Sequence, residues 1–138
     1  MNKINLENRV AIVTGGAQGF GLAITKRFIE SGARVLIWDK DTEYLNKVDL
    51  KNIQKIEVDV SNYKSVENAF AESLTHENKI DILINNAGIA GPNFKTWDYP
   101  LEEWQKVIDI DLTGVFYCCK TIVPVSYTHL RAHETTLD

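Results

Sequence analysis

A glycine-rich segment near the N-terminus has the spacing of a phosphate-binding loop. The stretch Thr14–Gly21 reads TGGAQGFG and lies between an apolar run and a segment of helical periodicity. Glycines let the backbone turn tightly and approach a pyrophosphate, and the following helix offers free N–H groups and a partial positive charge. The alternative is a glycine turn that serves packing alone. We interpret the segment as an anion-binding loop because a strand precedes it and a helix follows it.

A carboxylate ends the next apolar run, where a ribose-binding group is expected. Asp39 lies 18 residues after Gly21. A carboxylate there accepts hydrogen bonds from the ribose hydroxyls of a dinucleotide and repels a 2′-phosphate. We therefore predict NAD as the cofactor, with NADP less favoured. An Asp that caps the next helix is the alternative, and the neighbouring Lys40 acts in the opposite direction because a cation tolerates a phosphate.

Two further strand ends carry polar or small residues. Asp59 and Val60 could contact the edge of an adenine ring, although Asp59 and Ser61 could equally cap a helix. The sequence Asn85-Asn86-Ala87-Gly88 places amides where the fourth strand opens toward the same edge. Its alternative role is a turn whose side chains satisfy loop backbone groups. Spacing alone leaves both alternatives open.

The elements that must position these residues alternate between strands and helices. Strands are predicted at 9–14, 34–38, 53–58 and 80–84, and helices at 19–30, at 41–48, after Ser61 and after Pro100. Such alternation favours right-handed βαβ units, hence an α/β, Rossmann-like parallel sheet with helices on both faces. The predicted strand order is 3-2-1-4, the N-terminal half of such a fold. Each motif then lies at the carboxyl end of a strand, where ligands bind in these sheets.

Helical spacing also predicts which side chains face the core. Ser61 is the expected N-cap of the third helix. The first helix should bury Phe20, Ala23, Ile24 and Phe28, and the last should bury one stripe, formed by Leu101, Trp104, Ile108, Leu112, Val115 and Cys119.

Together the four motifs, in this order, resemble the short-chain dehydrogenase/reductase family over about residues 4–124. The resemblance implies hydride transfer between a nicotinamide cofactor and a secondary alcohol or ketone. It implies a set of cofactor-binding residues, with the loop at the pyrophosphate, Asp39 at the ribose, the Asp-Val pair at the adenine and the last two residues along the cofactor: Gly15, Gln18, Gly19, Phe20, Gly21, Asp39, Asp59, Val60, Asn86 and Gly88.

The residues of the chemical step do not follow the family pattern. The family uses a Tyr as acid/base, a Lys four residues later and a Ser. Tyr127 is followed by Arg131 and comes too early, so we reject it as the catalytic tyrosine. Asp111 stands where the family has an Asn that supports a proton-relay water, and an ordinary helix carboxylate is the alternative. We expect an NAD-dependent oxidoreductase whose 138-residue chain holds the cofactor half without appreciable turnover.

The last 14 residues differ in character from the rest. Residues 125–135 can be back-translated into a string that resembles a transposon-end adapter used in DNA library preparation. We therefore divide the chain into a Rossmann domain at 1–124 and a non-native tail at 125–138, with a natural variable C-terminus as the alternative. His129 and His133 lack a third ligand, so no metal site is expected.

Composition excludes several classes of function. The chain has 15 Lys and Arg against 19 Asp and Glu, a net charge of −4, and no basic cluster. Neither nucleic acid nor a membrane is therefore an expected partner. The chain begins without an apolar leader, and its two cysteines, Cys118 and Cys119, are adjacent. Both features favour a reducing, cytoplasmic location.

The expected partners are a small-molecule substrate and, by the family resemblance, further copies of the parent chain in a homo-oligomer. The pattern in residues 89–100 resembles that of sugar, sugar-acid or polyol dehydrogenases, and many family members are 3-oxoacyl reductases. A stand-alone nucleotide-binding module and a Rossmann methyltransferase are the alternative functions, although NNAG and the glycine spacing oppose the methyltransferase.

Overall fold

Four short apolar runs form one parallel sheet in this computed structural model, which describes residues 3–134. The strands are β1 (Val10–Thr14), β2 (Arg34–Asp39), β3 (Ile53–Glu57) and β4 (Ile82–Ile84), in the order β3-β2-β1-β4. Val13 of β1 pairs with Ile37 of β2 and with Ile84 of β4. The predicted strand order is confirmed, although β4 is two residues shorter than expected.

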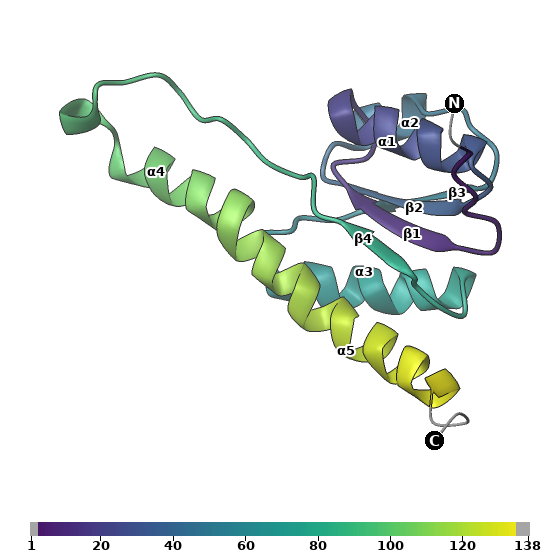
Figure 1. Cartoon of the computed structure of the whole chain (residues 1–138). Helices are drawn as coiled ribbons and strands as arrows, with labels where there is room; N and C mark the ends of the chain where they lie inside the picture. Colours follow the sequence, from purple (N-terminus) through teal and green to yellow (C-terminus); the bar gives the residue numbers. More distant parts are fainter. Residues whose placement is uncertain (1–2, 135–138) are drawn as a thin grey trace.

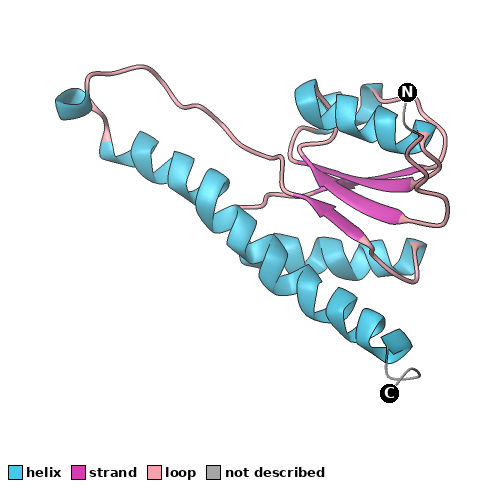
Figure 2. Ribbon diagram, viewed as in Figure 1, coloured by secondary structure: helices cyan, strands magenta, loops and turns pink. Residues whose placement is uncertain are grey.

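Helices cover both faces of this sheet, as predicted (Figure 1). On one face lie α1 (Gly19–Glu30) and α2 (Thr42–Lys47), and on the other lie α3 (Tyr63–His76) and α5 (Gly114–Glu134). A long connection with one 3-10 turn, η1 (Thr96–Asp98), leads from β4 to α4 (Leu101–Ile108), and a π-helical turn, η2 (Asp109–Thr113), joins α4 to α5. Figure 2 shows α4 and this connection extending away from the sheet.

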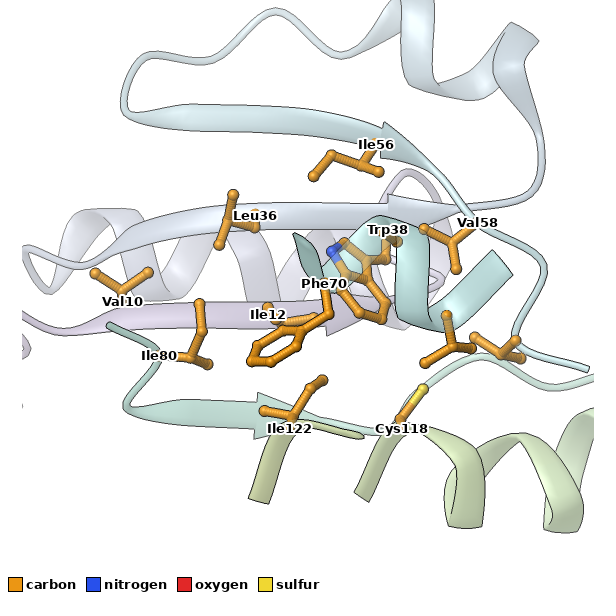
Figure 3. Packing of buried hydrophobic residues seen from close by; sticks show 13 residues of the cluster. Val10, Ile12, Leu36, Trp38, Ile56, Val58, Phe70, Ile80, Cys118 and Ile122 are labelled. Atoms are coloured by element: carbon orange, nitrogen blue, oxygen red, sulfur yellow. The ribbon is translucent and has the colours of Figure 1, made fainter. Parts of the chain in front are cut away.

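The two central strands are buried on both sides, which explains their continuous apolar sequences. Ile12, Leu36 and Trp38 face α3 and α5, where they pack with Phe70, Cys118 and Ile122 (Figure 3). The indole N–H of the buried Trp38 donates to Ser73 Oγ at 3.0 Å. This bond satisfies the polar group of the largest core side chain, so α3 is fixed to the sheet by packing and by a buried hydrogen bond.

Two predictions about helix ends and faces are wrong. The N-cap of α3 is Asn62, whose side-chain oxygen accepts from the N–H of Ser65 at 3.1 Å. Ser61 is instead bonded to Asp59. In α1 the most buried residues are Gly21 and Thr25, whereas Phe20 is 87% exposed. A small face lets α1 approach the sheet closely, and periodicity of large apolar residues does not reveal it.

The stripe predicted for the last helix is wrong as well. Leu101, Trp104 and Leu112 are exposed, and the buried positions of α5 are Gly114, Cys118 and Ile122. The cause is the π-helical turn, in which the N–H of Gly114 bonds to the carbonyl of Asp109. A wider i→i+5 turn holds an extra residue, so it rotates the following helix relative to the preceding one.

Part of the chain lies outside the described structure: residues 1–2 and 135–138, and the side chains of 127–134, among them Tyr127, His129 and His133. Among the helices of the described part, none combines the length and apolar character needed to span a lipid bilayer.

Candidate functional site

A cavity of about 830 Å³ opens at the carboxyl ends of the four strands. Its volume is that of a typical small-molecule or cofactor site. Nine of the ten residues predicted to bind a cofactor line it: Gly15, Gln18, Gly19, Phe20, Asp39, Asp59, Val60, Asn86 and Gly88. The tenth, Gly21, lies outside the lining. The fold therefore brings four separate sequence motifs to one edge of the sheet.

The glycine-rich loop presents an open surface to this cavity. Gly19 has a φ of +55°, and a Cβ added there would meet no atom within 4 Å. Gly21 is different, because a Cβ there would collide with the carbonyl oxygen of Gly15. Gly21 thus allows α1 to begin directly against the loop, while Gly19 leaves room for a ligand.

The N-terminus of α1 opens onto the same cavity. Its N-cap residue, Gln18, makes no side-chain capping bond, and the first turn contains no acidic residue. Gln18, Gly19 and Phe20 all line the cavity. The unpaired N–H groups and positive end of a helix attract an anion. This end of the cavity is therefore suited to a phosphate or pyrophosphate.

The hydroxyl of Thr14 joins the end of β1 to the NNAG segment. It accepts hydrogen bonds from the N–H groups of Asn86 at 3.0 Å and Ala87 at 2.9 Å, and donates to the carbonyl of Ile84 at 3.3 Å. The side-chain amide of Asn86 in turn donates to the carbonyls of Thr14 and Gly15. Asn86 therefore supports the glycine loop, which is the turn-stabilising role that the sequence left as an alternative.

Asp39 lies at the centre of these connections. One carboxylate oxygen accepts from the N–H of Ala17 at 3.1 Å, and the other accepts from the N–H of Asp41 at 3.0 Å. The residue is 7% exposed and lines the cavity. The alternative of an Asp39 helix cap is not what the structure contains, since Asp41 caps α2 by accepting from the N–H groups of Glu43 and Tyr44.

Asp59 is fixed at the neighbouring strand end. Its Oδ1 accepts from both the N–H and the hydroxyl of Ser61, at 3.0 and 2.6 Å, and its Oδ2 lies 3.7 Å from Lys40 Nζ. Burial opposes the charge of Asp59, but the Ser61 hydrogen bonds and the Lys40 ammonium outweigh it and lower the pKa of this carboxyl. Asp59 is therefore a charged, oriented acceptor at the cavity wall.

Asp111 lies in the π-helical turn, close to the NNAG segment. Its Oδ1 accepts from the N–H of Ile89 at 2.8 Å, and a Cβ on Gly88 would stand 3.2 Å from the same oxygen. An Asn would keep this acceptor, so Asp111 retains one of the two hydrogen-bonding functions of an amide. π-Helical turns often occur near functional sites.

Sequence reasoning missed some residues of the cavity wall. Trp38, Val58, Ala87, Ile89 and Ile110 line it. Val58 and Ala87 adjoin predicted motifs and could have been included on that ground. Ile110 reaches the cavity only because α4 and η2 fold back against the sheet, and no local pattern in the sequence signals that.

Comparisons with known proteins agree with this geometry. A family model described as short chain dehydrogenase matches residues 9–131. A 2-dehydro-3-deoxy-L-rhamnonate dehydrogenase (NAD(+)) of Sphingomonas sp. (strain SKA58) is 39% identical over 118 residues, covering 84% of this chain and 47% of that protein. A probable NADP-dependent mannitol dehydrogenase of Yarrowia lipolytica is 39% identical over 130 residues, covering 87% of this chain and 46% of that protein.

A solved structure shows the same similarity in three dimensions. The crystal structure of 3-ketoacyl-(acyl-carrier-protein) reductase from Brucella melitensis complexed with NADH aligns with a TM-score of 0.84 at 31% identity. The alignment covers 88% of this chain and 51% of that one. The chain thus spans about half the length of the relatives it matches.

Proposed function

Because the chain belongs to the short-chain dehydrogenase family, we propose that it is the cofactor-binding part of an NAD-dependent oxidoreductase. The observation that carries the proposal is the cavity at the strand ends, where an uncapped helix N-terminus, a glycine loop and two fixed carboxylates converge. A nicotinamide dinucleotide bound there would supply the hydride donor or acceptor for a secondary alcohol or ketone.

The residues present fit such a group. Open space at Gly19 admits a pyrophosphate to the helix N-terminus. Asp39 has acceptor capacity beyond its two backbone bonds, because a carboxylate offers about four lone-pair sites, and would accept from ribose hydroxyls. Asp59 and Val60 would flank the adenine, and Asn86 and Gly88 would lie along the remainder of the cofactor.

The charges around the cavity support NAD over NADP. Asp39, Asp41 and Asp59 line it together with a single cation among the described lining residues, Lys40. A 2′-phosphate would add negative charge to a region that is already negative, which disfavours it electrostatically. Among the relatives, one is named for NAD(+) and another as NADP-dependent, so the preference follows from this chain's own residues.

We extend the proposal to substrate, assembly and location. The relatives support a sugar, sugar-acid, polyol or 3-oxoacyl substrate, and residues 89–100 are the candidate entry loop. The exposed Trp104 and Leu112 support a homo-oligomeric parent protein. The free thiols of Cys118 and Cys119 support a reducing, cytoplasmic location.

Calorimetric titration of the 138-residue chain tests the cofactor proposal. We expect NAD to bind more tightly than NADP and S-adenosylmethionine not to compete. Gly19→Asn is the matched variant, because Asn tolerates a positive φ but places an amide in the open space. It should lower NAD affinity about tenfold or more, equivalent to roughly 1.4 kcal/mol, with thermal unfolding little changed. Preferential binding of S-adenosylmethionine would favour a methyltransferase instead.

The oxidoreductase proposal needs the complete gene product. Alcohol or ketone turnover with NAD by that product supports it, whereas NAD binding without turnover would identify a nucleotide-binding module.

We also propose that residues 125–138 are not native to this protein. Their back-translation resembles an adapter, although the family match runs to residue 131 and Ser126 Oγ donates to the carbonyl of Ile80 at 2.9 Å. Resequencing the source locus decides between the two: native codons for this tail in independent reads would contradict the proposal.

A further inference from the structure

The charged rim of the cavity contains an ion pair between two different strand ends. Lys40 follows β2 and Asp59 follows β3, and both residues line the cavity. Lys40 Nζ lies 3.7 Å from Asp59 Oδ2. Lys40 is directly next to Asp39 in the sequence, so its ammonium belongs to the part of the rim proposed above to receive the adenosine ribose.

The two partners are held very differently. Asp59 is anchored, because both the N–H and the hydroxyl of Ser61 bond to Oδ1 and its own N–H donates to Ser65 Oγ at 3.0 Å. These bonds leave Oδ2 directed at Lys40. The Lys40 side chain is 68% exposed, against 35% for Asp59. A flexible cation is therefore drawn toward a fixed carboxylate.

This arrangement bears on cofactor choice because Lys40 carries the one positive charge among the described residues that line the cavity. A free ammonium beside Asp39 would attract the 2′-phosphate that distinguishes NADP from NAD. Building on the proposed function, we propose that Asp59 is a second specificity-determining residue, which pairs with Lys40 and withholds its charge from a 2′-phosphate.

The size of the effect follows from the exposure of the pair. Exposed ion pairs contribute modestly, equivalent to about two- to fivefold in an equilibrium constant. The lowered pKa of Asp59, to which Lys40 contributes after burial and the Ser61 bonds, means that the carboxylate is charged at neutral pH. Asp59 thus tunes a preference whose larger share rests on Asp39.

A double-mutant cycle on the 138-residue chain, read as the ratio of NADP to NAD affinity, tests the proposal. The two dinucleotides differ only in the 2′-phosphate, so any loss of adenine contact in Asp59→Asn cancels in the ratio. We expect Asp59→Asn to raise the ratio about fivefold, Lys40→Met alone to change it less than twofold, and Asp59→Asn to act less than twofold in the Lys40→Met background.

Asp41→Asn is the matched control. It removes the same charge from the same rim, and Asn still caps α2. Its effect on the ratio should be the same with Lys40 and with Met. If Asp59→Asn is equally independent of Lys40, or if Lys40→Met by itself reduces NADP binding strongly, the proposal is overturned.

A measurement without cofactor separates this inference from the function on which it rests. NMR titration of the Asp59 carboxyl should give a higher pKa in Lys40→Met than in the unmodified chain, and an unchanged pKa overturns the pairing. A chain that binds neither dinucleotide contradicts the proposed function and the inference with it. A chain that binds NAD with an unaltered ratio in Asp59→Asn contradicts the inference alone.

Discussion

The side-chain carboxylate of Asp39 accepts a hydrogen bond from the backbone N–H of Ala17, 22 residues earlier in the sequence, at 3.1 Å. The end of β2 and the glycine-rich loop are therefore one hydrogen-bonded unit. A residue proposed to bind ribose also holds the loop proposed to bind pyrophosphate. Substitution of Asp39 should consequently affect both parts of a dinucleotide.

Asp39→Ala should lower NAD affinity about tenfold or more and narrow its advantage over NADP. Hydrogen bonds to charged groups contribute about 1.5–3 kcal/mol each, and tenfold corresponds to about 1.4 kcal/mol. Asp39→Asn is the control, because its amide oxygen can still accept from the loop while the charge is lost. Calorimetry measures both constants. An unchanged ratio would mean that Asp39 does not contact the ribose.

Thr14→Val should destabilise the fold by about 2 kcal/mol in urea denaturation. The substitution preserves shape but removes the hydroxyl that serves the N–H groups of Asn86 and Ala87. Buried donors left without partners cost about 1–3 kcal/mol. Thr14→Ser keeps the hydroxyl and should lose less than half as much. Equal losses in the two variants would assign the effect to the methyl group.

Asp111→Ala should lower stability by about 1 kcal/mol, since it removes the acceptor for the N–H of Ile89. Asp111→Asn keeps an acceptor oxygen and should remain within about 0.5 kcal/mol of the unmodified chain. Hydrogen exchange of the Ile89 amide reports the bond directly, with protection lost in the Ala variant and kept in the Asn variant. Loss of protection in both would show that the carboxylate charge is required.

Asp81→Ala should destabilise the chain in a pH-dependent manner. Asp81 accepts from the N–H of Val10 at 2.9 Å and pairs with Lys79 at 2.8 Å and Arg9 at 3.8 Å. Burial raises the pKa of this carboxyl, but these partners together outweigh burial and lower it below 3.8. A lowered native pKa stabilises the folded state above the ordinary pKa, and that stabilisation is lost as the pH falls through the native value.

The expected loss is therefore about 1–3 kcal/mol at pH 7 and smaller below pH 3.8. Urea denaturation at both pH values measures it. Asp49→Ala removes a carboxylate at an exposed position and controls for net charge. A loss that is the same at acidic and neutral pH would contradict the ionic contribution of Asp81.

Trp104→Glu and Leu112→Glu should reduce self-association in sedimentation velocity. Trp104 is 60% exposed and Leu112 is 64% exposed, and large exposed apolar groups favour association. Lys106→Glu, on the same helix, is the control for added negative charge. Identical sedimentation of all three variants and the unmodified chain would exclude this surface from association.

The sequence determined the strands and their order, because local patterns encode both. Val10–Thr14 and Arg34–Asp39 are almost wholly apolar, as strands buried on two faces must be. Right-handed crossovers then leave few possible arrangements. The motifs at the strand ends met in one cavity for the same reason, since parallel strands place their carboxyl ends at one edge.

Only the tertiary structure decided how those motifs hold one another. Thr14 meets Asn86 across 72 residues because β1 and β4 are adjacent in register, and Lys40 meets Asp59 because β2 and β3 are. The π-helical turn at Asp109–Thr113 moved the buried face of α5 from Val115 and Cys119 to Gly114 and Cys118. A regular 3.6-residue periodicity contains no sign of an i→i+5 turn, so this shift follows from packing against the sheet.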